Sequence, residues 1–485
     1  MDIKNKSLLK NLSYVDGEWI NANDGSVTEI LNPANSESLG SVPNCGSSET
    51  VAAIEAATKA QTKWSKADVK ERALVLRNLH RLMLENQYDL AKIITFEGGK
   101  PISESVGEIA YAASFFEWFS EEAKRVYGDV IPGHQYDRRT LVIKQPIGVV
   151  GCITPWNFPS AMLARKIAPA IAVGCSIVSK PAPETPFSAL AMAYLSELAG
   201  LPKGVLNIVT GDAEQIGAAL TGHKDIRKIT FTGSTSVGKL LLKQSAESVK
   251  KVSLELGGHA PFIIFDDADL DAAVDGALIA KYRNSGQTCV CANRIYVQSS
   301  IYDDFCERFT QKTSGLLVGN GLEEKTQQGP LISNNAMKKV SLHIKDAKDK
   351  GAKIATGGNP HALGGLFFEP TVLTGVTDDM LIAKEETFGP VAPIFSFESE
   401  QEVIRRANDT SYGLAAYFYT SDLGKSWRVS EQLEFGMVGL NTGIISTEMA
   451  PFGGIKESGL GREGSKYGVD DYLEMKYISL AGIEE

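Results

Sequence analysis

The stretch Gly148-Val-Val-Gly-Cys-Ile-Thr154 decides the fold, because this short apolar run has the composition of a buried strand. Three similar runs follow at residues 175–179, 205–209 and 226–232. Between and after these runs, apolar residues recur at helical spacing over residues 161–172, 186–199, 213–220 and 237–246. Strands and helices that alternate in this way predict a parallel sheet covered on both faces, as in nucleotide-binding proteins.

The segments on either side extend this α/β pattern. Residues 1–50 are rich in turns between short strands, residues 48–119 are mainly helical, and residues 130–146 alternate like a hairpin arm. Strands and helices alternate again after residue 255, which predicts a second α/β domain. The tail from Ser465 has the pattern of a strand, and we expect it to pair with the edge of another subunit.

Composition limits what the protein binds. The 485 residues carry a formal net charge of −10, so nucleic acid and anionic membrane surfaces would repel the chain. No apolar run approaches the roughly 20 residues that span a bilayer, and no secretory signal is visible. Six cysteines in a chain of this length do not form a disulfide framework, so we expect a reducing, cytoplasmic setting.

The loop Asn284-Ser-Gly-Gln-Thr-Cys-Val-Cys-Ala-Asn293 lies between a predicted helix and a predicted strand. Cys289 in this loop is a candidate nucleophile, provided that its pKa is lowered or that a base removes its proton. Cys291 could form a strained, reversible disulfide with it, or could be a small packed side chain. Zinc would need a second cluster of Cys or His, and the six histidines are scattered, so we predict no metal site.

Two polar residues are candidates to assist this thiol. Asn157 lies within Pro155-Trp-Asn-Phe-Pro159. An amide held so rigidly is a suitable donor to an oxyanion, although a rigid turn is the alternative. Glu255 lies within Ser253-Leu-Glu-Leu-Gly-Gly258, where burial should raise its pKa and suit it to general-base catalysis. A helix-capping or ion-paired glutamate is the alternative for Glu255.

Three further groups are candidates for cofactor binding. Gly233 and Ser234, in Phe231-Thr-Gly-Ser-Thr-Ser-Val-Gly238, would present backbone N–H groups at a helix N-terminus, where a pyrophosphate is favoured. Lys180 ends a predicted strand, at the edge of a parallel sheet where ligands bind. Glu386 follows another glutamate in a turn. An ordinary helix cap, a surface lysine and a solvated acidic face are the respective alternatives.

Taken together, these motifs resemble the aldehyde dehydrogenase superfamily. In chain order they are Pro155-Trp-Asn-Phe-Pro159, Phe231-Thr-Gly-Ser234, Glu255-Leu-Gly-Gly258, Gly286-Gln-Thr-Cys289, Glu385-Glu-Thr-Phe-Gly-Pro390 and Pro451-Phe-Gly-Gly454. The match covers essentially the whole chain and is greatest to bacterial succinate-semialdehyde dehydrogenases. The fold implied is α/β, with a Rossmann-type dinucleotide-binding domain (1–127 and 146–256), a catalytic domain (257–460) and a β-strand oligomerisation arm (128–145 and 461–485).

The resemblance implies a role for each candidate residue. Cys289 would attack the aldehyde carbon, while Asn157 and the Cys289 backbone N–H would hold the oxyanion. Glu255 would activate the water that hydrolyses the resulting thioester. Glu386 and Phe388 would position the nicotinamide and its ribose. The other cofactor-binding residues implied are Trp156, Asn157, Ser179, Lys180, Pro183, Gly233, Ser234 and Leu256.

Substrate and coenzyme choice follow from the same resemblance. Arg165 and Arg283 match positions that bind a terminal carboxylate, as in succinate semialdehyde, and Ser446 matches an assisting hydroxyl. Structural ion pairs are the alternative for both arginines. Pro183 stands where NAD-preferring relatives often carry glutamate, so we expect a preference for NADP, with NAD usable.

Other functions remain open at this point. One is a glutarate-semialdehyde or broad-specificity aldehyde dehydrogenase, because the same arginines would serve a longer substrate. Another is a non-catalytic binding or structural protein on the same fold. The assembly implied by the resemblance is a homodimer or a homotetramer.

Overall fold

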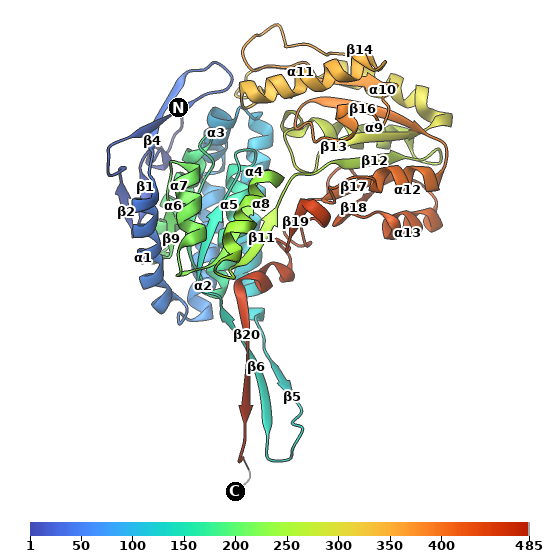
Figure 1. Cartoon of the computed structure of the whole chain (residues 1–485). Coiled ribbons are helices and arrows are strands. Elements are labelled where there is room, and N and C mark those ends of the chain that lie inside the picture. Colours follow the sequence, from blue (N-terminus) through green and yellow to red (C-terminus); the bar gives the residue numbers. More distant parts are fainter. Residues whose placement is uncertain (484–485) are drawn as a thin grey trace.

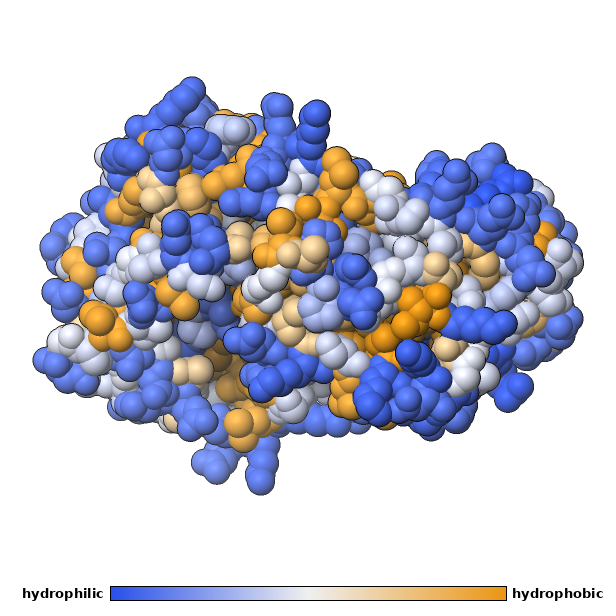
Figure 2. All heavy atoms as spheres, turned by 90° about the horizontal axis from the view of Figure 1, so that it is seen from above, coloured by the Kyte–Doolittle hydropathy of each residue, from blue (hydrophilic) through white to orange (hydrophobic). Residues whose placement is uncertain are grey.

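The computed structural model describes residues 1–483, which form a broad body with a narrow arm extending from it (Figure 1). Two large sheets lie in the body and helices cover them (Figure 1). Seen from above, the surface is mostly hydrophilic, with apolar patches between polar side chains (Figure 2). No helix in the described part of the chain is long and apolar enough to cross a membrane.

The helices are spread over the whole body. They are α1 (Ser47–Trp64), α2 (Val69–Glu85), α3 (Gln87–Gly98), α4 (Ile102–Glu122), α5 (Pro159–Val173), α6 (Pro186–Leu198), α7 (Ala213–Gly222), α8 (Thr235–Ala246), α9 (Leu270–Tyr282), α10 (Tyr302–Ser314), α11 (Asn334–Asp349), α12 (Glu400–Asn408) and α13 (Leu423–Gln432). The helical pattern expected over residues 48–119 corresponds to α1 to α4.

The first sheet has the strand order β19-β11-β10-β7-β8-β9-β1-β2. Its strands are β1 (Ser13–Val15), β2 (Glu18–Ile20), β7 (Val149–Ile153), β8 (Ser176–Lys180), β9 (Leu206–Ile208), β10 (Ile226–Thr232), β11 (Lys251–Glu255) and β19 (Gly459–Leu460). β7 to β11 are parallel neighbours, and antiparallel strands flank them. Every residue of β8 and β9 is buried, as expected for strands covered on both faces. The parallel sheet predicted from the alternating pattern is therefore confirmed.

The second sheet has the order β14-β15-β16-β13-β12-β17-β18. Its strands are β12 (Ala260–Ile264), β13 (Ala292–Gln298), β14 (Lys353–Thr356), β15 (Thr371–Thr374), β16 (Val391–Phe397), β17 (Ala415–Tyr419) and β18 (Met437–Leu440). The chain passes from the first sheet to the second between β11 and β12, directly after Glu255. It returns at β19, so the range 257–460 ends in a strand of the first sheet.

The arm consists of β5 (Asp129–Ile131), β6 (Arg139–Pro146) and β20 (Leu473–Leu480) (Figure 1). β20 pairs with β6 along its whole length. One edge of β20 is therefore taken by β6 of the same chain, which the sequence did not indicate, and pairing of its other edge with another subunit stays a prediction. Residues 484 and 485 of the arm range lie outside the described residues. A separate hairpin is formed by β3 (Val27–Leu31) and β4 (Ser38–Pro43).

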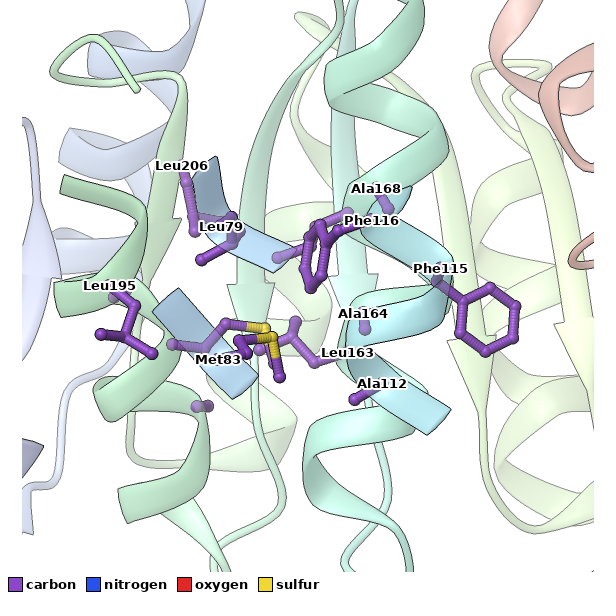
Figure 3. Close-up of a cluster of buried hydrophobic side chains, with 14 of the residues drawn as sticks. Leu79, Met83, Ala112, Phe115, Phe116, Leu163, Ala164, Ala168, Leu195 and Leu206 are labelled. Carbon is purple, nitrogen blue, oxygen red and sulfur yellow. The ribbon is translucent and has the colours of Figure 1, made fainter. Parts of the chain in front are cut away.

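A buried apolar cluster fixes α4 and α5 relative to the first sheet (Figure 3). Its members include Leu79 and Met83 of α2, Phe115 and Phe116 of α4, and Leu163 of α5. Each large apolar side chain buried in this way contributes about 1.5–3 kcal/mol. The cluster is important for the site because α4 and α5 carry several of the polar side chains described below.

Candidate active site

Four neighbouring parallel strands of the first sheet end at the edge where the candidate residues lie. Asn157 follows β7, Lys180 ends β8, Ser234 follows β10 and Glu255 ends β11. Ligands of open α/β sheets bind at this edge, because loops and helix N-termini converge there. The sheet thus gathers residues that lie far apart in the sequence.

A cavity of about 270 Å³ at this edge brings most of the candidate cofactor residues together with the candidate nucleophile. It is lined by Pro155, Trp156, Asn157, Met162, Thr232, Gly233, Ser234, Leu256, Gly257, Cys289, Lys339, Glu386 and Phe388. Sequence reasoning missed Met162, Thr232 and Lys339. Lys339 comes from α11, whose exposed amphipathic sequence has no local motif that marks a site.

Three candidate cofactor residues do not line this cavity. Within residues 1–483, the Ser179 hydroxyl is buried without a hydrogen-bond partner. Lys180 Nζ donates to the carbonyl oxygen of Pro181 at 3.0 Å, and burial lowers the pKa of its ammonium group. Pro183 faces a larger cavity of about 470 Å³, together with Glu184.

The Gly233–Ser234 segment has the geometry of a helix cap and also lines the cavity. The Ser234 side chain accepts a hydrogen bond from the Val237 N–H and so caps α8. The Gly233 N–H donates to the carbonyl oxygen of Glu255 at 3.0 Å. Capping, the alternative considered for this segment, is therefore compatible with a ligand at the N-terminus of α8.

The loop before Cys289 contains a left-handed turn of three consecutive residues. Asn284, Ser285 and Gly286 have φ values of 51°, 54° and 73°. Glycine adopts this region freely and asparagine tolerates it, but serine does so rarely. The Ser285 hydroxyl donates to the carbonyl oxygen of Gly329 at 2.9 Å, which offsets part of the strain. The sequence indicated a turn at the glycine alone.

Asn157 is held against the same loop. Its Nδ2 donates to the carbonyl oxygen of Gln287 at 3.1 Å, and Asn284 Nδ2 donates to the Asn157 carbonyl oxygen at 3.2 Å. These bonds fix the amide beside the segment that carries Cys289. An amide nitrogen carries two N–H groups, and no hydrogen bond of residues 1–483 uses the second one of Asn157.

The thiol of Cys289 is not predisposed to ionise. Burial raises its pKa to about 12, and the charges of Arg165 and Arg283 offset this only in part. Glu255 is buried, and its Oε2 has no hydrogen-bond partner within residues 1–483. Burial and the nearby Glu463 carboxylate raise the pKa of Glu255 well above 4.5. Glu255 therefore has the proton affinity that a general base near neutral pH requires.

Glu386 and Phe388 lie at one wall of the cavity. Glu386 Oε1 accepts the backbone N–H of Gly258 at 3.0 Å, and burial raises the pKa of this carboxyl to about 7. Phe388 has a φ of 54° and meets the Trp156 ring edge-on, with 5.6 Å between the ring centres. The alternative for Glu386, a solvated acidic face, does not fit its burial.

A second cavity of about 270 Å³ contains two of the three candidate substrate residues, Arg283 and Ser446. Its other lining residues are Glu104, Gly107, Glu108 and Tyr111 of α4, and Phe158. The Arg283 guanidinium carbon lies 4.8 Å from the centre of the Phe158 ring. Asn157 and Phe158 are adjacent in the chain and line the first and the second cavity respectively, so the two cavities are neighbours.

Arg165, the third candidate substrate residue, does not line the second cavity. Its side chain is 1% exposed, and its Nε donates to Glu463 Oε2 at 2.7 Å. Lys166 forms an ion pair with the same carboxylate, and the Arg165 guanidinium lies 3.9 Å from the centre of the Phe452 ring. The ion pair that was considered as the alternative for Arg165 is therefore present, and a direct contact with substrate stays a prediction.

Cys291, in the same loop as Cys289, is buried. Its Sγ is directed at the carbonyl oxygen of Lys281, 3.4 Å away, and both Cys289 and Cys291 are free thiols. This arrangement matches the packed side chain considered from the sequence. Within residues 1–483, no group of three or more His, Cys, Asp or Glu side chains is placed to hold a metal ion.

Comparison with known proteins places this geometry in a family. A family model described as "Aldehyde dehydrogenase family" matches residues 19–478. The chain belongs to this family. A glutarate-semialdehyde dehydrogenase of Pseudomonas aeruginosa is 60% identical to this aldehyde dehydrogenase over 483 residues, which is 100% of both chains.

Two comparisons with Escherichia coli proteins agree with this assignment. A succinate-semialdehyde dehydrogenase whose name specifies NADP(+) is 57% identical, covering 99% of this chain and 100% of its own. A crystal structure described as an NADP-dependent enzyme is similar with a TM-score of 0.98 at 57% identity, covering 99% of this chain and 100% of that chain. The aldehyde dehydrogenase fold expected from the motifs is thereby confirmed.

Proposed function

We propose that this aldehyde dehydrogenase oxidises succinate semialdehyde to succinate, with NADP preferred and NAD usable. The observation that carries the proposal is the second cavity, in which Arg283 and Ser446 lie next to the cavity that holds Cys289. An aldehyde with a terminal carboxylate would place its reactive end at Cys289 and its charge at Arg283. The names of two relatives support this choice, since each specifies an aldehyde of that kind.

In the proposed reaction, Cys289 adds to the aldehyde carbon and its proton passes to Glu255. The Asn157 amide and the Cys289 backbone N–H donate to the resulting oxyanion. A nicotinamide, when bound, would accept a hydride from the former aldehyde carbon, and a thioester would remain on Cys289. Glu255 first releases to solvent the proton that it took from Cys289. It then takes a proton from the water that attacks this thioester and passes it to the departing sulfur, so that the acid and the free thiol are released.

The lining of the first cavity fits a dinucleotide. Ser234 lies at the N-terminus of α8, where a pyrophosphate is favoured. At Pro183 there is no carboxylate to repel a 2′-phosphate, and the unpaired Ser179 hydroxyl and the Lys180 ammonium group are the groups proposed to contact one. A kcat/KM that strongly favours NAD over NADP would refute the preference.

A panel of aldehydes tests the substrate. Chains of three to six carbons, each with and without a terminal carboxylate, are assayed by NADPH absorbance with both coenzymes. Arg283→Ala should raise KM for succinate semialdehyde by about 10- to 100-fold, because a charge-assisted contact is lost, and should affect butanal far less. Equal losses for both aldehydes would count against the carboxylate role. Faster turnover of glutarate semialdehyde would favour that alternative, and no turnover at all would favour a non-catalytic protein.

We further propose the domain division 1–127 and 146–256, 257–460, and 128–145 with 461–485, as dinucleotide-binding domain, catalytic domain and oligomerisation arm. β20 is an edge strand of the arm with exposed Met475 and Tyr477, which supports a role in forming a homodimer or homotetramer. A cytoplasmic setting remains a proposal from composition alone.

A further inference from the structure

The second cavity contains a carboxyl group that the proposed function does not use. Glu104 and Glu108 of α4 line it together with Arg283. Glu108 forms a buried ion pair with Lys100, whereas Glu104 forms no ion pair within the described residues. Its Oε2 accepts the backbone N–H of Asn284 at 2.8 Å, and no hydrogen bond of residues 1–483 engages its Oε1. An unpaired carboxylate beside a site for another carboxylate would repel it.

The charge balance of the cavity wall determines whether the site can accept an anion. With both glutamates ionised, Lys100 and Arg283 balance them and the wall of the cavity is neutral. A substrate carboxylate would then leave one uncompensated negative charge in an enclosed site, which is costly. A proton on Glu104 restores the balance and also supplies an O–H donor.

Tyr111 lines this cavity, and other charged groups lie around it without lining it. They are Glu97 of α3, Glu448, and the buried cluster of Arg165, Lys166 and Glu463. Arg165 and Lys166 are already engaged by Glu463, and Glu97 accepts hydrogen bonds at the N-terminus of α6. None of these groups adds a free cation that would replace the proton.

We propose that Glu104 takes up a proton from solvent as the substrate carboxylate enters, and donates it in a hydrogen bond to that carboxylate beside Arg283. The proton returns to solvent when the product leaves. This inference rests on the proposed function, because it requires an anionic aldehyde. Burial raises the pKa of Glu104, and the charges of Lys100 and Arg283 offset this only in part. The side chain is only partly buried, so solvent protons can reach it.

The same carboxyl group is a positioning residue for the reactive loop. Asn284, which donates to Glu104 Oε2, is the first residue of the left-handed turn that leads to Cys289. A protonated carboxyl still accepts this N–H at its carbonyl oxygen. Glu104 thus connects the carboxylate end of the substrate with the loop that carries the nucleophile.

The test is the pH dependence of a ratio, kcat/KM for succinate semialdehyde divided by kcat/KM for butanal. Titration of Cys289 and Glu255 affects both aldehydes and cancels. In the unmodified enzyme the ratio should fall as pH rises, by up to about tenfold per pH unit above the pKa of Glu104. In Glu104→Gln the amide still accepts from Asn284 and donates to the carboxylate but cannot ionise, so the ratio should be independent of pH.

Glu117→Gln, the same substitution at an exposed position of α4, is the matched control and should keep the slope of the unmodified enzyme. A ratio that is flat with pH in the unmodified enzyme, or a slope that survives in Glu104→Gln, overturns the inference. Calorimetric titration of the unmodified enzyme with butyrate in two buffers of different ionisation enthalpy adds a measurement that needs no variant. Proton uptake on binding is expected, and its absence refutes the proposal.

The two proposals fail in different ways. If the ratio is near one at every pH and Arg283→Ala does not change it, the proposed substrate is refuted, and this inference with it. A ratio that collapses in Arg283→Ala, combined with a pH slope that persists in Glu104→Gln, refutes only the role of Glu104.

Discussion

Replacing Glu463 with glutamine tests how the buried ion cluster supports the fold and controls Glu255. Glu463 accepts hydrogen bonds from Arg165 and Lys166, and all three side chains are buried. Removing the carboxylate leaves two buried cations without a counter-charge, which costs about 3–5 kcal/mol. At about 1 °C per kcal/mol for a chain of 485 residues, Tm should fall by about 3–5 °C.

The loss of stability in Glu463→Gln should depend on pH. Burial opposes ionisation of Glu463, but Lys166 and Arg165 outweigh it and lower the pKa from 4.5 to about 2. A carboxyl whose folded-state pKa is depressed stabilises the protein above its unfolded-state pKa. The difference in Tm between the two proteins should therefore be complete above pH 4.5 and disappear as pH falls towards 2.

Activity should respond as well. After burial, the charge of Glu463 is the largest influence that raises the pKa of Glu255. Without that charge the pKa of Glu255 falls, so the acidic limb of kcat/KM for butanal should move to lower pH. The assays are thermal scans at one fixed rate and a pH series of initial rates.

A surface pair provides the control. Glu85 pairs with Arg81 at 2.6 Å, and both side chains are more than half exposed. Glu85→Gln should change stability by only about 0–1 kcal/mol and leave the pH profile in place. If Glu463→Gln also changed Tm by less than about 1 °C at neutral pH and kept the acidic limb, the reasoning about the cluster would be refuted.

Three further predictions concern the loop and the first cavity. In the unmodified enzyme we expect KM for NADP to fall as pH rises through about 7, because the Glu386 carboxylate then forms. This fall should be absent in Glu386→Gln, and a fall that persists there would exclude Glu386 as its cause. Cys291→Ala should leave the rate of peroxide inactivation unchanged, because the buried sulfur faces a backbone carbonyl group; slower inactivation would instead indicate a disulfide with Cys289. Asn284→Ala should lower kcat, and it should lower the free energy of unfolding by about 1–2 kcal/mol through backbone strain alone. Asn284→Gly should avoid this strain but also lose the hydrogen bond to Asn157, so equal Tm values for the two variants would contradict the strain argument.

Much of the fold could be predicted because its signals are local. The strands at residues 148–232 are short apolar runs between helical segments, and the sheet places their carboxyl ends in one row. Motifs near those ends marked Asn157 and Ser234 as candidates, Glu255 was marked at the end of the next parallel strand, and Cys289 was marked by the loop before β13. The pairing of β20 with β6 joins segments more than 300 residues apart, and no local pattern specifies such a partner.

The environment of the charged groups could not be predicted for the same reason. Arg165 has the residue type of a carboxylate ligand, but its partner Glu463 lies 298 positions further along the chain. Glu104 and Lys339 are polar residues of amphipathic helices, and nothing in their neighbours distinguishes them from solvated side chains. Ser285 in a left-handed conformation has no compositional signal either, since the bond that stabilises it comes from a distant loop.

The left-handed turn has a consequence for redesign of the enzyme. Asn284 is bonded to α4 and to Asn157, and Ser285 is bonded to the segment at Gly329, so an insertion or deletion in this loop would shift the sulfur relative to the donors around it. The far wall of the second cavity is different, because single side chains on one face of α4 and the loop at Ser446 form it. Engineers who seek a new aldehyde specificity can therefore vary Tyr111 or Ser446 singly, while Glu104 is kept and holds the reactive loop in place.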